Sequence, residues 1–183
     1  MQNSTPPNST HRPASAAPRA QAAPSDSASN CVAIASCGRR FAAFPVAVVA
    51  LAMDSQGRFL LLRRPGKTSW EPPSGALEAG ESPLSGLRRE LREELGPAFS
   101  FQVLGPVHAT SFRFDSSLGN VVGIAFAVRH LGGPVVPSDD MAGADVDWVS
   151  FDSLRLRPEI PIPGEIEPYA LALDLFRRPA SPS

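Results

Sequence analysis

The segment SPLSGLRRELREELGP, residues 82–97, carries the start, the apolar face and the end of one amphipathic helix. Ser82 is a favourable N-cap, and Pro83 suits the first helical position, where no amide hydrogen is required. Gly96 and Pro97 end the helix, with glycine in its usual place just past the last turn. Between these ends, leucines recur at helical spacing as one narrow apolar stripe: Leu84, Leu87, Leu91 and Leu95. The pattern predicts a helix over residues 83–95.

Carboxylates gather on and just before this helix. Glu90, Glu93 and Glu94 are related by i, i+3 and i+4, so they share one face beside the leucines, and Glu81 precedes the helix. Like charges at this spacing repel, and Arg89, four residues before Glu93, offsets only part of that repulsion. Mg²⁺ or Mn²⁺ would offset it better, because these ions prefer carboxylates, carbonyls and water. A solvated, charged helix face is the ordinary alternative, but the pattern favours a metal-dependent enzyme that acts on phosphate.

The spacing of these residues from Gly75 onward resembles the signature of the Nudix hydrolase family. That signature reads glycine, five residues, glutamate, seven residues, then Arg-Glu-aliphatic-any-Glu-Glu-any-Gly-aliphatic. The positions of this chain that match it are Gly75, Glu81, Arg89, Glu90, Leu91, Glu93, Glu94 and Gly96. Pro97 stands in place of the last aliphatic residue and does not threaten a metal site.

The resemblance implies a role for each carboxylate. Glu90 and Glu94 are expected to be the principal ligands of Mg²⁺ or Mn²⁺, with Glu93 close by, directly or through water. The backbone carbonyl of Ser74, just before the first glycine of the signature, matches a position that often completes the coordination. Arg89 is expected to orient one of these glutamates through a charge-assisted hydrogen bond.

The general base stays open among three candidates: Glu81, Glu93 and an acid later in the chain. Four aspartates follow the predicted sheet and are candidates for that later acid: Asp139, Asp140, Asp145 and Asp147. For any one of them, an ordinary solvated loop residue is the more common situation.

Substrate contacts are less constrained by the sequence. Arg63 and Arg64 are candidates for binding substrate phosphates, and so is Lys67, although each also fits ordinary surface charge. Trp70 can stack on a base or cover the edge of the core. His108 is expected to be structural. In the run Phe112-Arg113-Phe114 the arginine faces opposite to the two rings, which is typical of core patterning in a strand.

The resemblance implies a metal-dependent pyrophosphohydrolase that cleaves a nucleoside diphosphate linked to another moiety, or a nucleoside triphosphate. The alternative is a non-catalytic nucleotide-binding sensor on the same fold, but degenerate members of that class typically lose glutamates that this chain keeps. An isoprenoid diphosphate isomerase would need a cysteine in the core, and Cys31 and Cys37 lie in or near the N-terminal tail. Catalysis of phosphoanhydride hydrolysis is therefore the preferred interpretation.

Composition divides the chain into a tail, one domain and a short end. Residues 1–38 are rich in Ser, Ala and Pro and are expected to be disordered, either as a plain extension, a start codon placed too early, or a targeting signal. Residues 39–178 are expected to form the domain and 179–183 a flexible C-terminus. The net charge of −1 argues against nucleic-acid binding, and no apolar run spans a bilayer. We expect a cytoplasmic protein with a small-molecule nucleotide derivative as partner; a homodimer stays open.

The domain shows alternating strand and helix patterns. The predicted strands are 46–53, 58–64, 99–107, 110–114, 121–129 and 147–149, followed by a helical turn over 152–156 and a helix over 165–177. Strands on both sides of a central helix, with a closing helix, predict an α/β fold, an α/β/α sandwich around a mixed β-sheet. The family resemblance implies the same fold over about residues 41–178.

Overall fold

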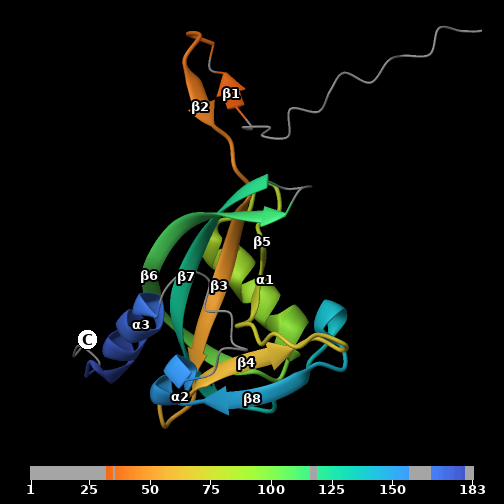
Figure 1. Ribbon diagram of the computed structural model, residues 1–183, viewed down its shortest axis with the longest axis vertical. Coiled ribbons are helices and arrows are strands. Elements are labelled where there is room, and N and C mark those ends of the chain that lie inside the picture. Colours follow the sequence, from red (N-terminus) through yellow and green to blue (C-terminus); the bar gives the residue numbers. More distant parts are fainter. Residues whose placement is uncertain (1–31, 35, 116–118, 157–165, 180–183) are drawn as a thin grey trace, which may run out of the picture.

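Strand β3 (Val46–Met53) lies at the centre of a six-stranded mixed sheet. The computed structural model describes residues 32–34, 36–115, 119–156 and 166–179 (Figure 1). The sheet has the order β6-β7-β3-β4-β8, with β5 also paired to β3. Only the β3–β7 pair is parallel among these described strands. The remaining sheet strands are β4 (Phe59–Arg63), β5 (Ser74–Ala76), β6 (Ser100–Asp115), β7 (Gly119–Gly132) and β8 (Asp145–Val149).

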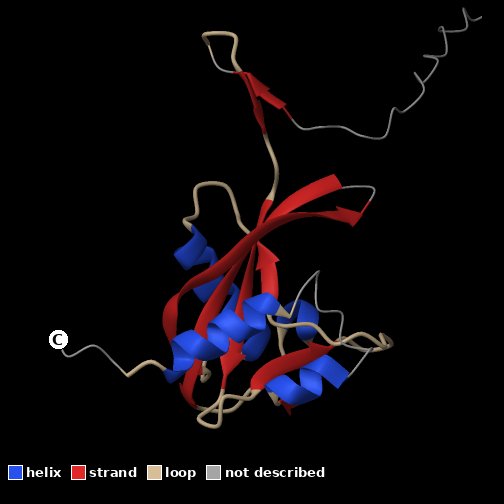
Figure 2. Ribbon diagram, turned by 60° about the vertical axis from the view of Figure 1, so that its left-hand side comes forward, coloured by secondary structure: helices blue, strands red, loops and turns tan. Residues whose placement is uncertain are grey.

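Helices cover both faces of the sheet, because consecutive side chains of a strand point to opposite sides. Val48 and Ala50 of β3 pack in one buried cluster with the leucines of α1 (Pro83–Leu95). Leu51 of the same strand packs in a second cluster with α3 (Glu167–Arg177) and with Leu154 of α2 (Phe151–Leu156). Figure 2 shows the helices on the two sides of the strands. The predicted α/β/α sandwich around a mixed sheet is confirmed.

Helix α1 has the predicted bounds and the predicted caps. The Ser82 hydroxyl oxygen accepts a hydrogen bond from the Ser85 backbone amide at 3.2 Å, and Pro83 opens the helix. Gly96 ends it with φ of 84°, a conformation that glycine adopts without strain. Leu87, Leu91 and Leu95 are buried in the first cluster, whereas Leu84 is 41% exposed because the cluster does not extend to the first turn.

Some predicted element boundaries were wrong. The two strands expected over 99–107 and 110–114 form one long strand, β6, because shifts of register near Gly105 and His108 keep it paired with β7 past Pro106. Strand β8 begins at Asp145 rather than Asp147, since Asp145 pairs with Arg63 of β4. Helix α3 begins at Glu167, and residue 165, its expected start, lies outside the described residues.

Part of the expected disordered tail is a strand. Strand β1 (Val32–Ile34) pairs with β2 (Arg40–Ala42) in a two-stranded sheet that stands apart from the rest of the domain (Figure 1). Gly38, with φ of 81°, allows the turn between the two strands, and Ile34 pairs with Arg40. The division of the chain into a tail, one domain and a short C-terminus stays a prediction. Residues 1–31, most of the predicted tail, and 180–183, most of the predicted C-terminus, lie outside the described residues. In the described part of the chain, the helices are too short or too polar to cross a membrane.

Candidate active site

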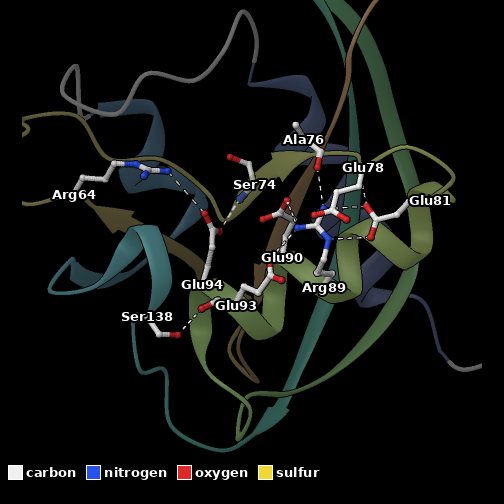
Figure 3. Close-up of polar contacts among 10 residues, drawn as sticks. All are labelled: Arg64, Ser74, Ala76, Glu78, Glu81, Arg89, Glu90, Glu93, Glu94 and Ser138. Carbon is white, nitrogen blue, oxygen red and sulfur yellow. Dashed lines mark hydrogen bonds and ion pairs between the residues drawn. The ribbon is translucent and has the colours of Figure 1, made fainter.

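Strand β5 brings the loop before α1 against the last turns of that helix. Glu94 is 1% exposed, and its Oε2 accepts a hydrogen bond from the Ser74 backbone amide at 2.9 Å (Figure 3). Its second oxygen, Oε1, is buried without a hydrogen-bond partner, and Nη2 of Arg64 lies 3.9 Å away. Burial, with smaller contributions from the negative charges of Asp140 and Glu90, raises the pKa of Glu94 to about 8.

Glu90 reaches the same loop one turn earlier. A Cβ atom added at Gly75 would lie 2.0 Å from the carboxyl carbon of Glu90, so the carboxylate occupies space that only glycine leaves free. Burial raises the pKa of Glu90 as well, although its contact with Arg89 opposes the shift. The glycine that opens the signature is therefore required for the close approach of a carboxylate to the loop.

Arg89 joins the other carboxylates of the signature. Its Nε and Nη2 donate to the two oxygens of Glu81 at 2.9 and 3.0 Å, and Nη1 donates to Glu90 at 2.9 Å and to Glu93 at 2.8 Å. Nη2 also donates to the Ala76 carbonyl oxygen at 2.9 Å. Figure 3 shows the guanidinium between these groups. The planar fork of arginine, which presents five N–H donors, suits such a multiple contact.

The two arginines considered for substrate phosphates lie in different places. Arg64 donates to Glu71 at 2.6 Å and to Asp140 at 2.7 Å, beside the buried oxygen of Glu94. Arg63 instead forms a two-contact ion pair with Asp145, at 3.0 and 2.6 Å. The Arg63 guanidinium also lies 4.9 Å from the centre of the Trp70 ring. Arg64 therefore lies beside Glu94 of α1, whereas Arg63 contacts Asp145 and Trp70 instead.

Two of the four later aspartates form ion pairs with arginines. Asp145 pairs with Arg63, and Asp140 pairs with Arg64. Asp139 and Asp140 belong to a short 3-10 turn, η1 (Asp139–Met141), and Asp147 lies in β8 opposite Leu61. Of these aspartates, Asp140 contacts an arginine that adjoins the carboxylates of α1.

The donors at the loop fit a hard divalent cation. Within residues 32–34, 36–115, 119–156 and 166–179, no group of three or more His, Cys, Asp or Glu side chains is arranged so that it could hold a metal ion. Mg²⁺, however, usually keeps several water ligands and binds through one or two carboxylates. Glu90 and Glu94 supply two, and the second carries a buried oxygen without a partner. Such an oxygen is costly to leave unpaired, and a cation would satisfy it.

A pocket on the α3 side of the sheet is lined by residues that were not among the predicted site residues. It has a volume of about 350 Å³, and His108, Phe112 and Tyr169 line it together with Pro72, two residues before Ser74. His108 and Phe112 were expected to be structural or core residues. Phe114, expected in the core, is 61% exposed. No signal in the sequence distinguishes pocket-lining residues of β6 from core residues, because the alternation of side chains along the strand does not show which face borders a pocket.

Comparison with known proteins decides the family. A model of the NUDIX domain matches residues 43–169, more than half of the chain. The chain belongs to the Nudix family. A MutT-like protein of Streptomyces ambofaciens is 30% identical to this Nudix protein over 112 residues, which are 61% of this chain and 68% of the relative. The RNA pyrophosphohydrolase of Halorhodospira halophila is 50% identical over 50 residues, 26% of this chain and only 28% of the relative.

Solved structures of other proteins share the fold. The MutT protein from Methanosarcina mazei Go1 is 26% identical with a TM-score of 0.51, over 73% of this chain and 90% of that chain. An ADP-ribose pyrophosphatase from Streptococcus suis 89-1591 is 19% identical with a TM-score of 0.57, over 74% and 94%. The match to a UDP-X diphosphatase spans 64% of that chain. The predicted family and fold class are confirmed. Membership of this family supports the predicted enzyme class, a hydrolase acting on phosphoanhydride bonds.

Proposed function

We propose that this protein is a metal-dependent Nudix pyrophosphohydrolase. Its substrate is a nucleoside diphosphate linked to another moiety, or a nucleoside triphosphate, cleaved at a phosphoanhydride bond. The observation that carries this proposal is the convergence of Glu90 and Glu94 on the loop at Ser74 and Gly75, with one oxygen of Glu94 buried and unpartnered. An isolated buried carboxylate is unfavourable unless a positive charge compensates it.

Glu90, Glu94 and the Ser74 carbonyl oxygen are the groups that would hold Mg²⁺ or Mn²⁺. When bound, such an ion neutralises phosphate oxygens and lowers the pKa of a bound water. Arg89 keeps Glu90 and Glu93 in fixed orientations through its two Nη1 contacts. Arg64, whose Nη2 lies 3.9 Å from Oε1 of Glu94, would contact an oxygen of the pyrophosphate. The products would be a nucleoside monophosphate and the phosphorylated second moiety, or pyrophosphate.

The contacts support Glu93 rather than Glu81 as the general base. Hydrogen bonds from Arg89, and then from the Glu78 amide, lower the pKa of Glu81 to about 2. A base works best when its pKa lies near the working pH, so Glu81 in this contact is a weak proton acceptor. The Glu93 side chain is 40% exposed, and one oxygen, Oε2, bonds to Arg89. Glu81 then acts as the anchor for Arg89.

The pocket at Phe112 supports a nucleoside as one part of the substrate. It combines apolar walls with His108 and Thr110, which can hydrogen-bond, and it begins two residues from Ser74. Ligand sites are commonly apolar with a few polar groups. Trp70 is a weaker candidate for base stacking, because the Arg63 guanidinium already lies over its ring. Arg63 is likewise the weaker candidate for a phosphate contact, because it pairs with Asp145, whereas Arg64 lies beside the oxygen of Glu94.

A panel assay on the full chain tests the proposal. The purified protein is offered nucleotide sugars, ADP-ribose, dinucleoside polyphosphates, coenzyme A and oxidised nucleoside triphosphates, with Mg²⁺, with Mn²⁺ or with a chelator, and the nucleotide products are measured by chromatography. We expect turnover of at least one compound with metal and none with chelator. Glu94→Gln should abolish this turnover. The control Glu78→Gln, which neutralises an exposed glutamate in the loop before α1, should retain it. Binding without turnover by the native chain would instead support the sensor alternative, and full activity of Glu94→Gln would contradict a metal role for Glu94.

A further inference from the structure

The C-terminal end of α1 is held by a segment more than forty residues later in the chain. The last carbonyl groups of a helix have no partner within the helix and must find one elsewhere. Here Gly96 donates its amide to the Arg92 carbonyl oxygen at 3.1 Å, and Val136 donates to Leu95 at 3.0 Å. The two carbonyls between them, those of Glu93 and Glu94, are satisfied by a single residue. That residue is Ser138.

Ser138 makes both contacts at once. Its backbone amide donates to the Glu94 carbonyl oxygen at 3.0 Å, and its hydroxyl donates to the Glu93 carbonyl oxygen. Figure 3 shows the hydroxyl directed at the end of the helix that carries the two glutamates. The half-buried hydroxyl is therefore a side-chain cap for the turn in which Glu93 and Glu94 lie.

The turn that follows Ser138 is also tied to the site. Asp139 has φ of 54°, a conformation that residues other than glycine seldom adopt, so surrounding contacts must hold the turn in place. Met141, fully buried, anchors it in the cluster below α1. Asp140 pairs with Arg64 at 2.7 Å, and Arg64 adjoins the unpartnered oxygen of Glu94. This segment therefore contacts Glu94 in two ways. Ser138 binds the backbone of Glu94, and Asp140 binds Arg64, which lies beside the Glu94 carboxylate.

We propose that Ser138 is a positioning residue for the metal-binding carboxylates. Its hydroxyl keeps the last turn of α1 from fraying, so that Glu93 and Glu94 meet the loop at Ser74 in one geometry. The inference rests on the proposed metal-dependent function. Helix ends fray readily, and groups that orient metal ligands typically change metal affinity about 10- to 100-fold when removed.

Removal of the hydroxyl in Ser138→Ala tests this role, and Ser138→Thr is the conservative rescue. Ser82→Ala is the matched control, because it removes the cap at the opposite end of the same helix. Mn²⁺ binding to the full chain without substrate is measured by the loss of the free-ion paramagnetic resonance signal, and thermal unfolding is followed in parallel. We expect Ser138→Ala to weaken Mn²⁺ binding about tenfold or more, Ser138→Thr to retain it, and Ser82→Ala to lower the unfolding temperature with unchanged Mn²⁺ affinity.

Unchanged Mn²⁺ affinity in Ser138→Ala, or an equal loss in Ser82→Ala, would overturn the role of Ser138. Absence of Mn²⁺ binding by the native chain would overturn the proposed function itself, so the two failures are distinguishable. If the alanine variant does not fold, Ser138→Cys keeps the side-chain size but donates only weakly, and the same weakened binding is expected. Native affinity in a folded Ser138→Cys protein would also contradict the inference.

Discussion

The carboxylate of Glu94 accepts a hydrogen bond from the backbone amide of Ser74, 20 residues earlier, at 2.9 Å. This contact joins the face of α1 that carries Glu90 and Glu94 to the loop that precedes the helix. It also leaves the second oxygen of Glu94 buried without a hydrogen-bond partner. A proton or a cation can satisfy that oxygen.

The metal-free protein should lose stability as the pH rises from about 5 to about 9. Burial raises the pKa of Glu94 from 4.5 to about 8, so the folded state holds a proton that the unfolded state releases. Stabilisation is complete below pH 4.5 and disappears through about pH 8. Denaturant unfolding in chelator at several pH values measures it. Glu94→Gln should flatten this dependence; an equally steep fall in that variant would show that another group titrates.

Metal binding should release protons and tighten with pH in the same range. A ligand must be deprotonated before it can bind a cation, and Glu94 holds its proton near neutral pH. Calorimetric titration of Mg²⁺ or Mn²⁺ in buffers of different ionisation enthalpy measures the number of protons released. Proton release should be smaller in Glu94→Gln, and pH-independent affinity between about pH 6 and about pH 9 would be inconsistent with Glu94 as a ligand.

Replacement of Gly75 by alanine should reduce turnover by about 100-fold or more while the domain remains folded. The new methyl group would occupy the position of the Glu90 carboxylate, and misplacement of a reacting group by about 1 Å can cost that much. Steady-state kinetics and denaturant unfolding measure the two effects. In a Glu90→Gln background, Gly75→Ala should reduce turnover only slightly further, because both changes disable the same Glu90 carboxylate. Additive losses would show that Gly75 acts independently of Glu90.

Arg89→Lys should lower kcat about 10- to 100-fold. A lysine has one ammonium group and cannot contact Glu81, Glu90 and Glu93 in the fixed fork geometry of arginine. Arg88→Lys, one residue earlier on the exposed side of the helix, is the control and should behave as the native enzyme. Equal activity of the two variants would mean that charge alone is sufficient at position 89.

Leu91→Ala should cost about 2–5 kcal/mol of unfolding free energy, because Leu91 is fully buried between α1 and the sheet. Leu84 belongs to the same sequence stripe but is 41% exposed, so Leu84→Ala should cost less than about 1 kcal/mol. Urea unfolding monitored by circular dichroism measures both. Similar losses would contradict the observed end of the core at the first turn.

Phe112→Ala should raise KM for the best substrate about tenfold with a smaller effect on kcat, if the pocket holds the nucleoside. Phe114, two residues later, is 61% exposed and outside the pocket, so Phe114→Ala should leave KM near the native value. A loss confined to kcat in Phe112→Ala would place the ring near the reacting phosphate instead.

Local patterns were sufficient for α1 and for the metal hypothesis. The caps Ser82 and Gly96 are local signals, and the spacing of Glu90 and Glu94 is set by the pitch of the helix itself. Strand β3 was found for the same reason, since its eight apolar residues read as one buried run. The division of β6 into two strands failed, because bulges that carry pairing past Pro106 depend on β7 rather than on β6 alone.

The sequence by itself determined the helix with its three carboxylates, the glutamate that precedes it, and the family resemblance. It could do so because helical spacing and capping act between residues close along the chain. Tertiary structure alone decided that Arg64 approaches Glu94 while Arg63 pairs with Asp145. It also decided that Phe112 lines a pocket and that Ser138 caps the end of α1. These contacts join distant segments, and they depend on strand register and on the twist of the sheet, which short-range patterns do not encode.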